Sequence, residues 1–248
     1  MYYISIGAFC NVKYQIDKHK GVKETLFFDR LITSMSSIIQ LLECDNIHNI
    51  LNNNSIVRNP TNPVKDSNSR IIIKSLKSCE SIHDIPVNFN ETHINDFIDK
   101  YKRRYLRIIN FIKSSEKLCF IRYNKISIEE KRLFVEAVLK INPVCNFTLV
   151  NVYTTKPAKI KCERKTCMYL RHINLANNGG SHCCKSCKIS GVHGPVCQNN
   201  NFKKYSVGIS KSKYCLDLKL ISQTPQEPDW TTDYLDWKKI FKNIEKFI

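Results

Sequence analysis

Short apolar runs alternate with amphipathic helical patterns through the first 155 residues, and this alternation constrains the fold more than any other feature of the sequence. Residues 2–6 have the apolar and aromatic character of a buried strand, and residues 117–123 and 147–153 are similar. Residues 95–114 repeat apolar side chains every three or four positions, which is typical of one helix face. We therefore predict an α/β fold with a mixed or mostly parallel sheet and flanking helices.

Turn and capping residues predict the remaining elements. Helices are expected over residues 11–20 (closed by Gly21), 35–44 (capped by Thr33 or Ser34), 127–140 (with Ser127 and Glu130 as a capping box) and 235–247. Strands are expected over residues 70–75 and 216–221, and residues 25–29 are expected to be a short extended piece. Residues 45–69 are rich in Asn and are predicted to be mostly loop.

The periodicity disappears between residues 161 and 204, where Gly, Asn, Cys and His dominate. This change predicts three segments: an α/β domain over residues 1–158, a small irregular Cys/His-rich insert over 159–204, and a strand and helix over 205–248 that return to the α/β domain. The insert has few apolar residues, so something other than a hydrophobic core must hold it together.

Six of the 12 cysteines lie in this insert, in a pattern typical of zinc ligands. A first tetrahedral set consists of Cys184, Cys187, His193 and Cys197, and a second of Cys162, Cys167, His182 and Cys183. The spacing does not decide whether Cys183 or Cys184 is a ligand, or whether one or two zinc ions bind. Disulfides or unpaired thiols are the alternative. We expect zinc in a structural role, because the chain has no His-Glu-x-x-His motif for a catalytic site.

Cys10 is a candidate nucleophile, because a strand running through Gly7-x-x-Cys10 into a helix places the sulfur at the helix N-terminus. The helix dipole there favours the thiolate and lowers the pKa of the thiol. A histidine must lie close enough to take the proton. The alternative is a tight turn with a buried cysteine. The same strand–turn–helix order also occurs in α/β hydrolases.

Several motifs resemble those of an uncharacterised family of papain-like cysteine peptidases. The shared segments are Ile4-Ser-Ile-Gly-Ala-Phe-Cys10, Tyr14-Gln15, Leu26-Phe-Phe-Asp29, Leu31-Ile-Thr33, His83-Asp84, the helix at residues 100–111 and Cys119-Phe-Ile-Arg122. The sequence departs from the family pattern at Phe27, where proline is usual, and at Arg30, where tryptophan is usual.

The resemblance implies a thiol hydrolase or acyltransferase that acts on a protein or peptide. In it Cys10 would be the nucleophile and His83 the base, with His93 as a competing base. Asp29 matches the family motif and would either orient the imidazole or only brace its turn.

The net charge of +17 and the basic run at residues 100–107 make nucleic acid a possible partner, although the run is also typical of a solvated helix face. No apolar stretch approaches the roughly 18 residues of a membrane span, and no signal peptide is evident. We therefore expect a cytoplasmic protein.

The insert resembles a cysteine-rich segment of giant DNA virus proteins, which would place the chain in the host cytoplasm or virion. The alternatives to an enzyme are a zinc-containing nucleic-acid-binding protein and a non-catalytic viral structural protein.

Overall fold

The computed structural model describes residues 1–59, 70–81, 84–86, 88–155, 205–222 and 235–248. The chain forms two compact units. The first comprises Met1–Tyr153, Ile209–Leu218 and Pro228–Ile248, and the second comprises Thr154–Gly208 and Lys219–Glu227. The first unit contains nearly all of the described helices and strands.

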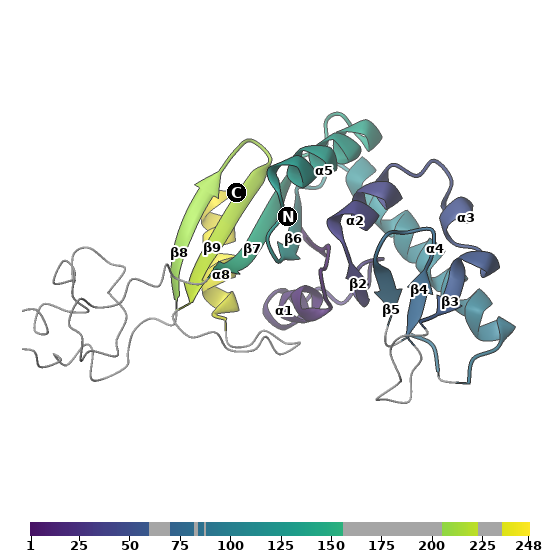
Figure 1. Ribbon diagram of the computed structural model, residues 1–248. Coiled ribbons are helices and arrows are strands. Elements are labelled where there is room, and N and C mark those ends of the chain that lie inside the picture. The colour runs from purple at the N-terminus through teal and green to yellow at the C-terminus, as the bar shows by residue number, and fades with distance from the viewer. Residues whose placement is uncertain (60–69, 82–83, 87, 156–204, 223–234) are drawn as a thin grey trace, which may run out of the picture. The chain divides into compact units, whose positions relative to one another are not determined.

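The larger sheet has the strand order β1-β6-β7-β9-β8 (Figure 1). Its strands are β1 (Tyr2–Ser5), β6 (Leu118–Tyr123), β7 (Phe147–Thr155), β8 (Tyr205–Lys211) and β9 (Cys215–Ser222). β1 pairs with β6 in parallel, and β6 pairs with β7 in parallel. The predicted mixed or mostly parallel α/β sheet is thereby confirmed, whereas β8 was not predicted.

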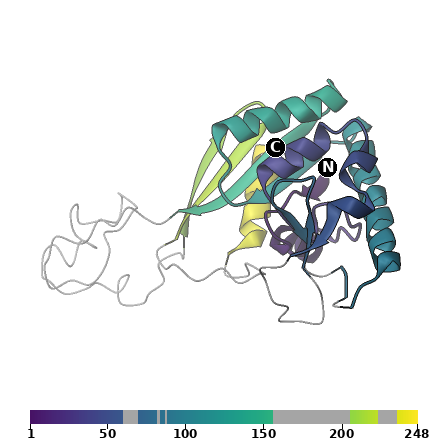
Figure 2. The ribbon, with the colours of Figure 1, turned by 45° about the vertical axis from the view of Figure 1, so that its right-hand side comes forward.

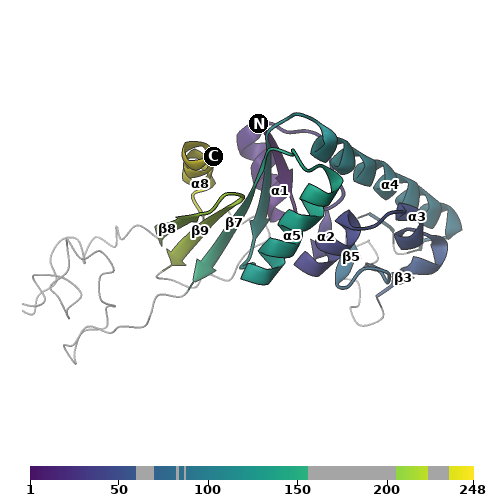
Figure 3. The same cartoon turned by 90° about the horizontal axis from the view of Figure 1, so that it is seen from above.

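Helices lie on both faces of this sheet (Figure 3). α1 (Asn11–Lys20) and α8 (Trp237–Phe247) cover one face, where the ring of Tyr3 meets the ring of Phe241 edge-on. α5 (Ile128–Ile141) covers the other face, where Phe120, Phe134 and Phe147 pack edge to face. These aromatic contacts fix the helices to the sheet, since each ring removes a large apolar surface from water.

A second, antiparallel sheet has the order β2-β5-β4-β3. Its short strands are β2 (Leu31–Thr33), β3 (Ile56–Arg58), β4 (Ile71–Ile73) and β5 (Cys79–Ser81). They are accompanied by α2 (Met35–Leu42), α3 (Ile47–Ile50), the 3-10 turn η1 (Asn53–Ser55) and α4 (Glu91–Lys113). Figure 2 shows α4, the long teal helix, running beside the small sheet.

Two predictions in this region are wrong. Residues 25–29 do not extend but turn, because Asp29 hydrogen-bonds back to Leu26. The Asn-rich segment from residue 45 contains α3, η1 and β3 rather than mostly loop, because its asparagines cap the helical turns.

Local capping explains where several helices begin and end. Ser34 caps α2, and Ser127 and Glu130 form the predicted capping box of α5. Gly21 ends α1 in the left-handed conformation, at φ 66°. α4 begins four residues earlier than predicted, because Asn90 and His93 form a capping box that lengthens it.

We predict that Phe134→Ala lowers the free energy of unfolding by about 3–5 kcal/mol, since it removes a fully buried ring from between α5 and the sheet. Ile128→Ala on the same helix is the control, because that side chain is 87% exposed and its loss should change stability by less than about 0.5 kcal/mol. Urea denaturation measures both. Equal effects would show that the aromatic cluster does not hold α5.

Candidate active site

Cys10 occupies the N-cap position of α1, immediately after the loop that leaves β1. Its side chain is half-buried and makes no capping hydrogen bond. β1, β6 and β7 run in parallel, so the loop lies at the carboxyl edge of these strands. Open α/β sheets bind their ligands at this edge.

Residues 7–10, here called the 7–10 loop, are fastened to two strands. The Tyr123 N–H donates to the Gly7 carbonyl over 3.2 Å, and the Ala8 N–H donates to the Tyr123 carbonyl over 3.4 Å. From β2, the Thr33 N–H donates to the Ala8 carbonyl over 3.0 Å. The loop is therefore held by the larger sheet on one side and by the smaller sheet on the other.

Gly7 is required in this loop for two reasons. Its φ of 80° lies in the left-handed region, which other residues rarely adopt. A Cβ at this position would also clash with Thr33 Oγ1 and would lie 3.2 Å from Arg122 Nη1. The Gly-x-x-Cys spacing therefore reflects close backbone approach as well as a tight turn.

The pKa of the Cys10 thiol is raised, which is opposite to the direction predicted from its place at a helix N-terminus. Burial raises the pKa, and this outweighs the lowering by the backbone amide of Cys10 and by the charge of Arg30. A thiol with a raised pKa is protonated at neutral pH. A separate proton acceptor is then needed to generate the thiolate.

His83, the predicted base, lies outside the described residues. The strand that precedes it is described: Ser81, at the end of β5, pairs with Leu31 of β2. Arg30, whose charge acts on Cys10, directly precedes Leu31. Residues 82–83 therefore directly follow β5, and the partner strand β2 begins at the residue after Arg30.

His93, the competing base, has a structural role at the start of α4. Its Nδ1 lies 2.6 Å from the Asn90 side-chain oxygen, in the capping box of that helix. Within the described part of the chain, none of the interactions of Cys10 involves an imidazole.

Asp84, the neighbour of His83, is held by three donors. Lys100 Nζ donates over 2.6 Å, the Tyr101 hydroxyl over 2.5 Å and the Ser81 hydroxyl over 3.2 Å. Burial by itself would raise the pKa of Asp84, but the hydrogen bonds from Lys100 and Tyr101 hold it below its usual value. The residue that follows His83 is therefore an anchored, ionised carboxylate.

Asp29 is fully buried and braces the turn before β2. Its Oδ2 accepts the Leu26 N–H over 2.5 Å, and its Oδ1 has no hydrogen-bond partner among the described residues. Burial raises the pKa of this carboxyl to about 7, against the opposing charges of Lys13 and Arg104. The side chain fixes the turn that leads to Arg30.

Arg122 is a site residue whose role the sequence analysis missed. It lies at the end of β6, is 6% exposed, and donates to the carbonyls of Ile6 and Thr33. Burial lowers the pKa of its guanidinium to about 10, so the group stays charged at neutral pH. The available signal was a cation in a six-residue strand that is otherwise apolar.

The basic run at residues 100–107 is largely engaged within the fold. Lys100 pairs with Asp84, Arg104 is buried with its guanidinium 4.7 Å from the Tyr101 ring centroid, and Arg107 donates to a backbone carbonyl. The prediction of nucleic-acid binding through this run therefore depends on Lys102 and Arg103, which are partly exposed and exposed, respectively.

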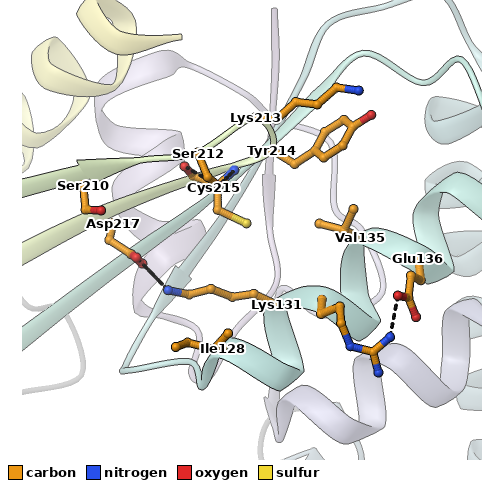
Figure 4. Close-up of a pocket in the computed structure, with 11 residues that line it drawn as sticks. Ile128, Lys131, Val135, Glu136, Ser210, Ser212, Lys213, Tyr214, Cys215 and Asp217 are labelled. Atoms are coloured by element: carbon orange, nitrogen blue, oxygen red, sulfur yellow. Dashed lines mark hydrogen bonds and ion pairs between the residues drawn. The ribbon is translucent and has the colours of Figure 1, made fainter.

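A groove of ≈ 420 Å³ lies between α5 and the β8–β9 hairpin (Figure 4). Lys131 Nζ and Asp217 Oδ1 form an ion pair of 2.6 Å across it. No residue of the 7–10 loop lines it, so it is a feature separate from the surroundings of Cys10.

The predicted zinc ligands Cys162, Cys167, His182, Cys183, Cys184, Cys187, His193 and Cys197 all lie outside the described residues. In the part of the chain that the structure describes, no cluster of three or more His, Cys, Asp or Glu side chains could hold a metal. No described helix has the length and apolar character that crossing a membrane requires.

Comparison with known families confirms the resemblance found in the sequence. Residues 1–156 match the profile of the family described as "Putative papain-like cysteine peptidase (DUF1796)". Neither a curated protein nor a solved structure matches the chain significantly. The family match ends before Cys162, so it does not test the resemblance of the insert to giant-virus proteins.

We predict that Asp29 makes stability fall as pH rises. Its folded-state pKa of about 7 lies above the ordinary value of about 3.9, so the folded protein binds this proton more tightly than the unfolded chain. The stabilisation is complete below pH about 4. It is lost between pH about 4 and about 7, at a slope of about 1.4 kcal/mol per pH unit.

Asp29→Asn should remove this slope in urea denaturation curves recorded across that pH range. Asp84→Asn is the matched control and should keep the slope between pH about 4 and about 7. The lowered pKa of Asp84 gives a pH dependence of opposite sign, in which stability is lost as pH falls below about 4. A wild-type slope retained in Asp29→Asn would contradict the assignment.

Proposed function

The chain belongs to the DUF1796 family, whose profile residues 1–156 match, and on this basis we propose that it is a thiol hydrolase or acyltransferase with Cys10 as nucleophile and His83 as general base. The observation that carries the proposal is the position of Cys10. Its half-buried sulfur begins α1 at the carboxyl edge of three parallel strands, on a loop fixed by hydrogen bonds from both sheets.

The raised pKa of Cys10 supports the need for a base. His83 is the candidate because β5, which leads to it, pairs with β2, and β2 begins next to Arg30. Asp84, the residue after His83, is anchored by hydrogen bonds from Lys100, Tyr101 and Ser81. We assign Asp29 the bracing role, because its raised pKa leaves the carboxyl substantially protonated near neutrality.

The proposed reaction proceeds through a thioester. The imidazole takes the Cys10 proton as the sulfur attacks the substrate carbonyl, and the resulting oxyanion accepts hydrogen bonds from the free amides at the start of α1. We assign this task to the Asn11 N–H. The Val12 N–H is not, because it already donates to the Asn11 side chain over 2.8 Å. The imidazolium then protonates the leaving amine or alcohol, and water or a second acceptor releases the acyl group.

We predict that iodoacetamide alkylates Cys10 at neutral pH at least about tenfold faster in the wild type than in His83→Ala. The imidazole accepts the thiol proton and so raises the fraction of reactive thiolate. His93→Ala is the matched control and should keep the wild-type rate, since that ring caps α4. Peptide mass spectrometry assigns the label to Cys10, with half-buried Cys215 as an internal comparator.

Cys10→Ala should abolish turnover of fluorogenic peptides and of ester substrates without changing the unfolding midpoint. Alkylation of Cys10 in the wild type no faster than that of a free thiol, or full turnover by Cys10→Ala, would overturn the proposal.

The Cys/His-rich insert is proposed to bind structural zinc and to shape substrate access. Zinc measured by plasma mass spectrometry should be stoichiometric in the purified protein and should fall in Cys184→Ser and Cys187→Ser. Cys145→Ser is the control, because this thiol lies in the α/β core. Metal-free protein with the insert cysteines alkylated as free thiols would contradict the proposal.

A further inference from the structure

Arg122 carries a buried charge that the proposed chemistry does not use. No carboxylate among the described residues forms an ion pair with it, and its side chain is directed at backbone carbonyls instead. Nη1 donates to the Ile6 carbonyl over 2.7 Å, and Nη2 donates to the Thr33 carbonyl over 2.8 Å. Burying a guanidinium is costly, and the two hydrogen bonds offset this cost together with the negative charge of Glu130, which favours the charged form.

The two carbonyls lie on either side of the 7–10 loop. Ile6 directly precedes Gly7 in the chain, and Thr33 binds the loop through its own N–H, which donates to the Ala8 carbonyl. Arg122 therefore closes a ring of contacts that runs from Ile6 through the loop to Thr33 and back through the guanidinium. Its two terminal nitrogens diverge in a fixed plane, which suits them to bridge two carbonyls.

The loop also rests directly on this group. Arg122 Nη1 lies 3.2 Å from the position of a Cβ on Gly7, and Thr33 Oγ1 lies closer still. The neighbouring residue of β6, Tyr123, exchanges backbone hydrogen bonds with Gly7 and Ala8. The end of β6 thus holds the loop by main chain and by side chain together.

We propose that Arg122 is a positioning residue that locks the 7–10 loop between β1, β6 and β2 and so fixes the Cys10 sulfur in its half-buried place at the start of α1. This inference rests on the proposed function of Cys10. Arg122 acts through the loop rather than on the sulfur, since the charge felt by Cys10 comes from Arg30.

The test compares Arg122→Met with the parent protein, both in the His83→Ala background so that the imidazole does not contribute. The pH dependence of iodoacetamide alkylation gives the apparent pKa of Cys10. In the parent protein burial keeps this pKa high. Release of the loop should expose the sulfur to water and bring the pKa of the thiol down toward the ordinary value of about 8.5.

A direct electrostatic role for Arg122 would shift the pKa of Cys10 upward, because a nearby positive charge would have been lost. That result, or an unchanged pH profile, would overturn the positioning role. With His83 restored, the same substitution should lower kcat about 100-fold and leave KM within about threefold, as expected when the nucleophile is misplaced.

Two further variants separate positioning from general destabilisation. Arg122→Lys keeps the charge but can reach only one carbonyl, so Cys10 should have a pKa between those of the parent and Arg122→Met. This variant supplies the readout if Arg122→Met does not fold. Lys131→Met removes one cation whose ammonium binds Asp217 rather than the loop, and should leave the alkylation profile unchanged. The alkylation readout requires no turnover, so it can fail or succeed independently of the hydrolase proposal.

Discussion

The arrangement around Cys10 depends on the clamp that Arg122 forms between the carbonyls of Ile6 and Thr33. These carbonyls belong to different parts of the fold, since Ile6 follows a strand of the larger sheet and Thr33 ends a strand of the smaller one. Thr33 Oγ1 and, less closely, Arg122 Nη1 leave no space for a side chain at position 7. The clamp thus acts together with the left-handed backbone of Gly7 and the close approach of Thr33 Oγ1 at the start of the 7–10 loop.

Burial determines the acid–base character of the site. It raises the pKa of the Cys10 thiol and of the Asp29 carboxyl, so both groups favour their neutral forms. The neutral thiol is an unreactive state that an imidazole can convert to the thiolate. The neutral carboxyl suits a brace, because it can stay inside the core without a counter-ion. Asp84 is ionised, because hydrogen bonds from Lys100 and Tyr101 outweigh the effect of burial on its pKa.

The larger sheet, except for β8, and its helices were predictable, because their signals are local. Apolar strands, three- and four-residue periodicity and the Ser127 capping box all lie within single segments of the sequence. The smaller sheet was largely missed because strands of three residues, such as β2 and β5, form through pairing between segments about 50 residues apart. The turn at Asp29 was mistaken for an extended piece because its aromatic residues resemble a strand.

Within the site, the location of Cys10 followed from Gly-x-x-Cys after a strand. The clamp could not be predicted, because Arg122 is 116 positions from Ile6 and meets it only when β1 and β6 pair. The direction of the Cys10 pKa shift also depends on how deeply the folded chain buries the sulfur. The roles of His83 and of the insert cysteines remain predictions from sequence and family membership.

The most direct measurement is the distance from the Cys10 sulfur to the nearest His83 ring nitrogen, in a crystal structure of the protein with a peptide aldehyde bound. The account predicts a hemithioacetal on Cys10 with that nitrogen within hydrogen-bond reach, about 3–4 Å from the sulfur, allowing for the larger radius of sulfur. An unmodified Cys10, or a His83 ring more than about twice that distance away with no other imidazole in its place, would contradict it.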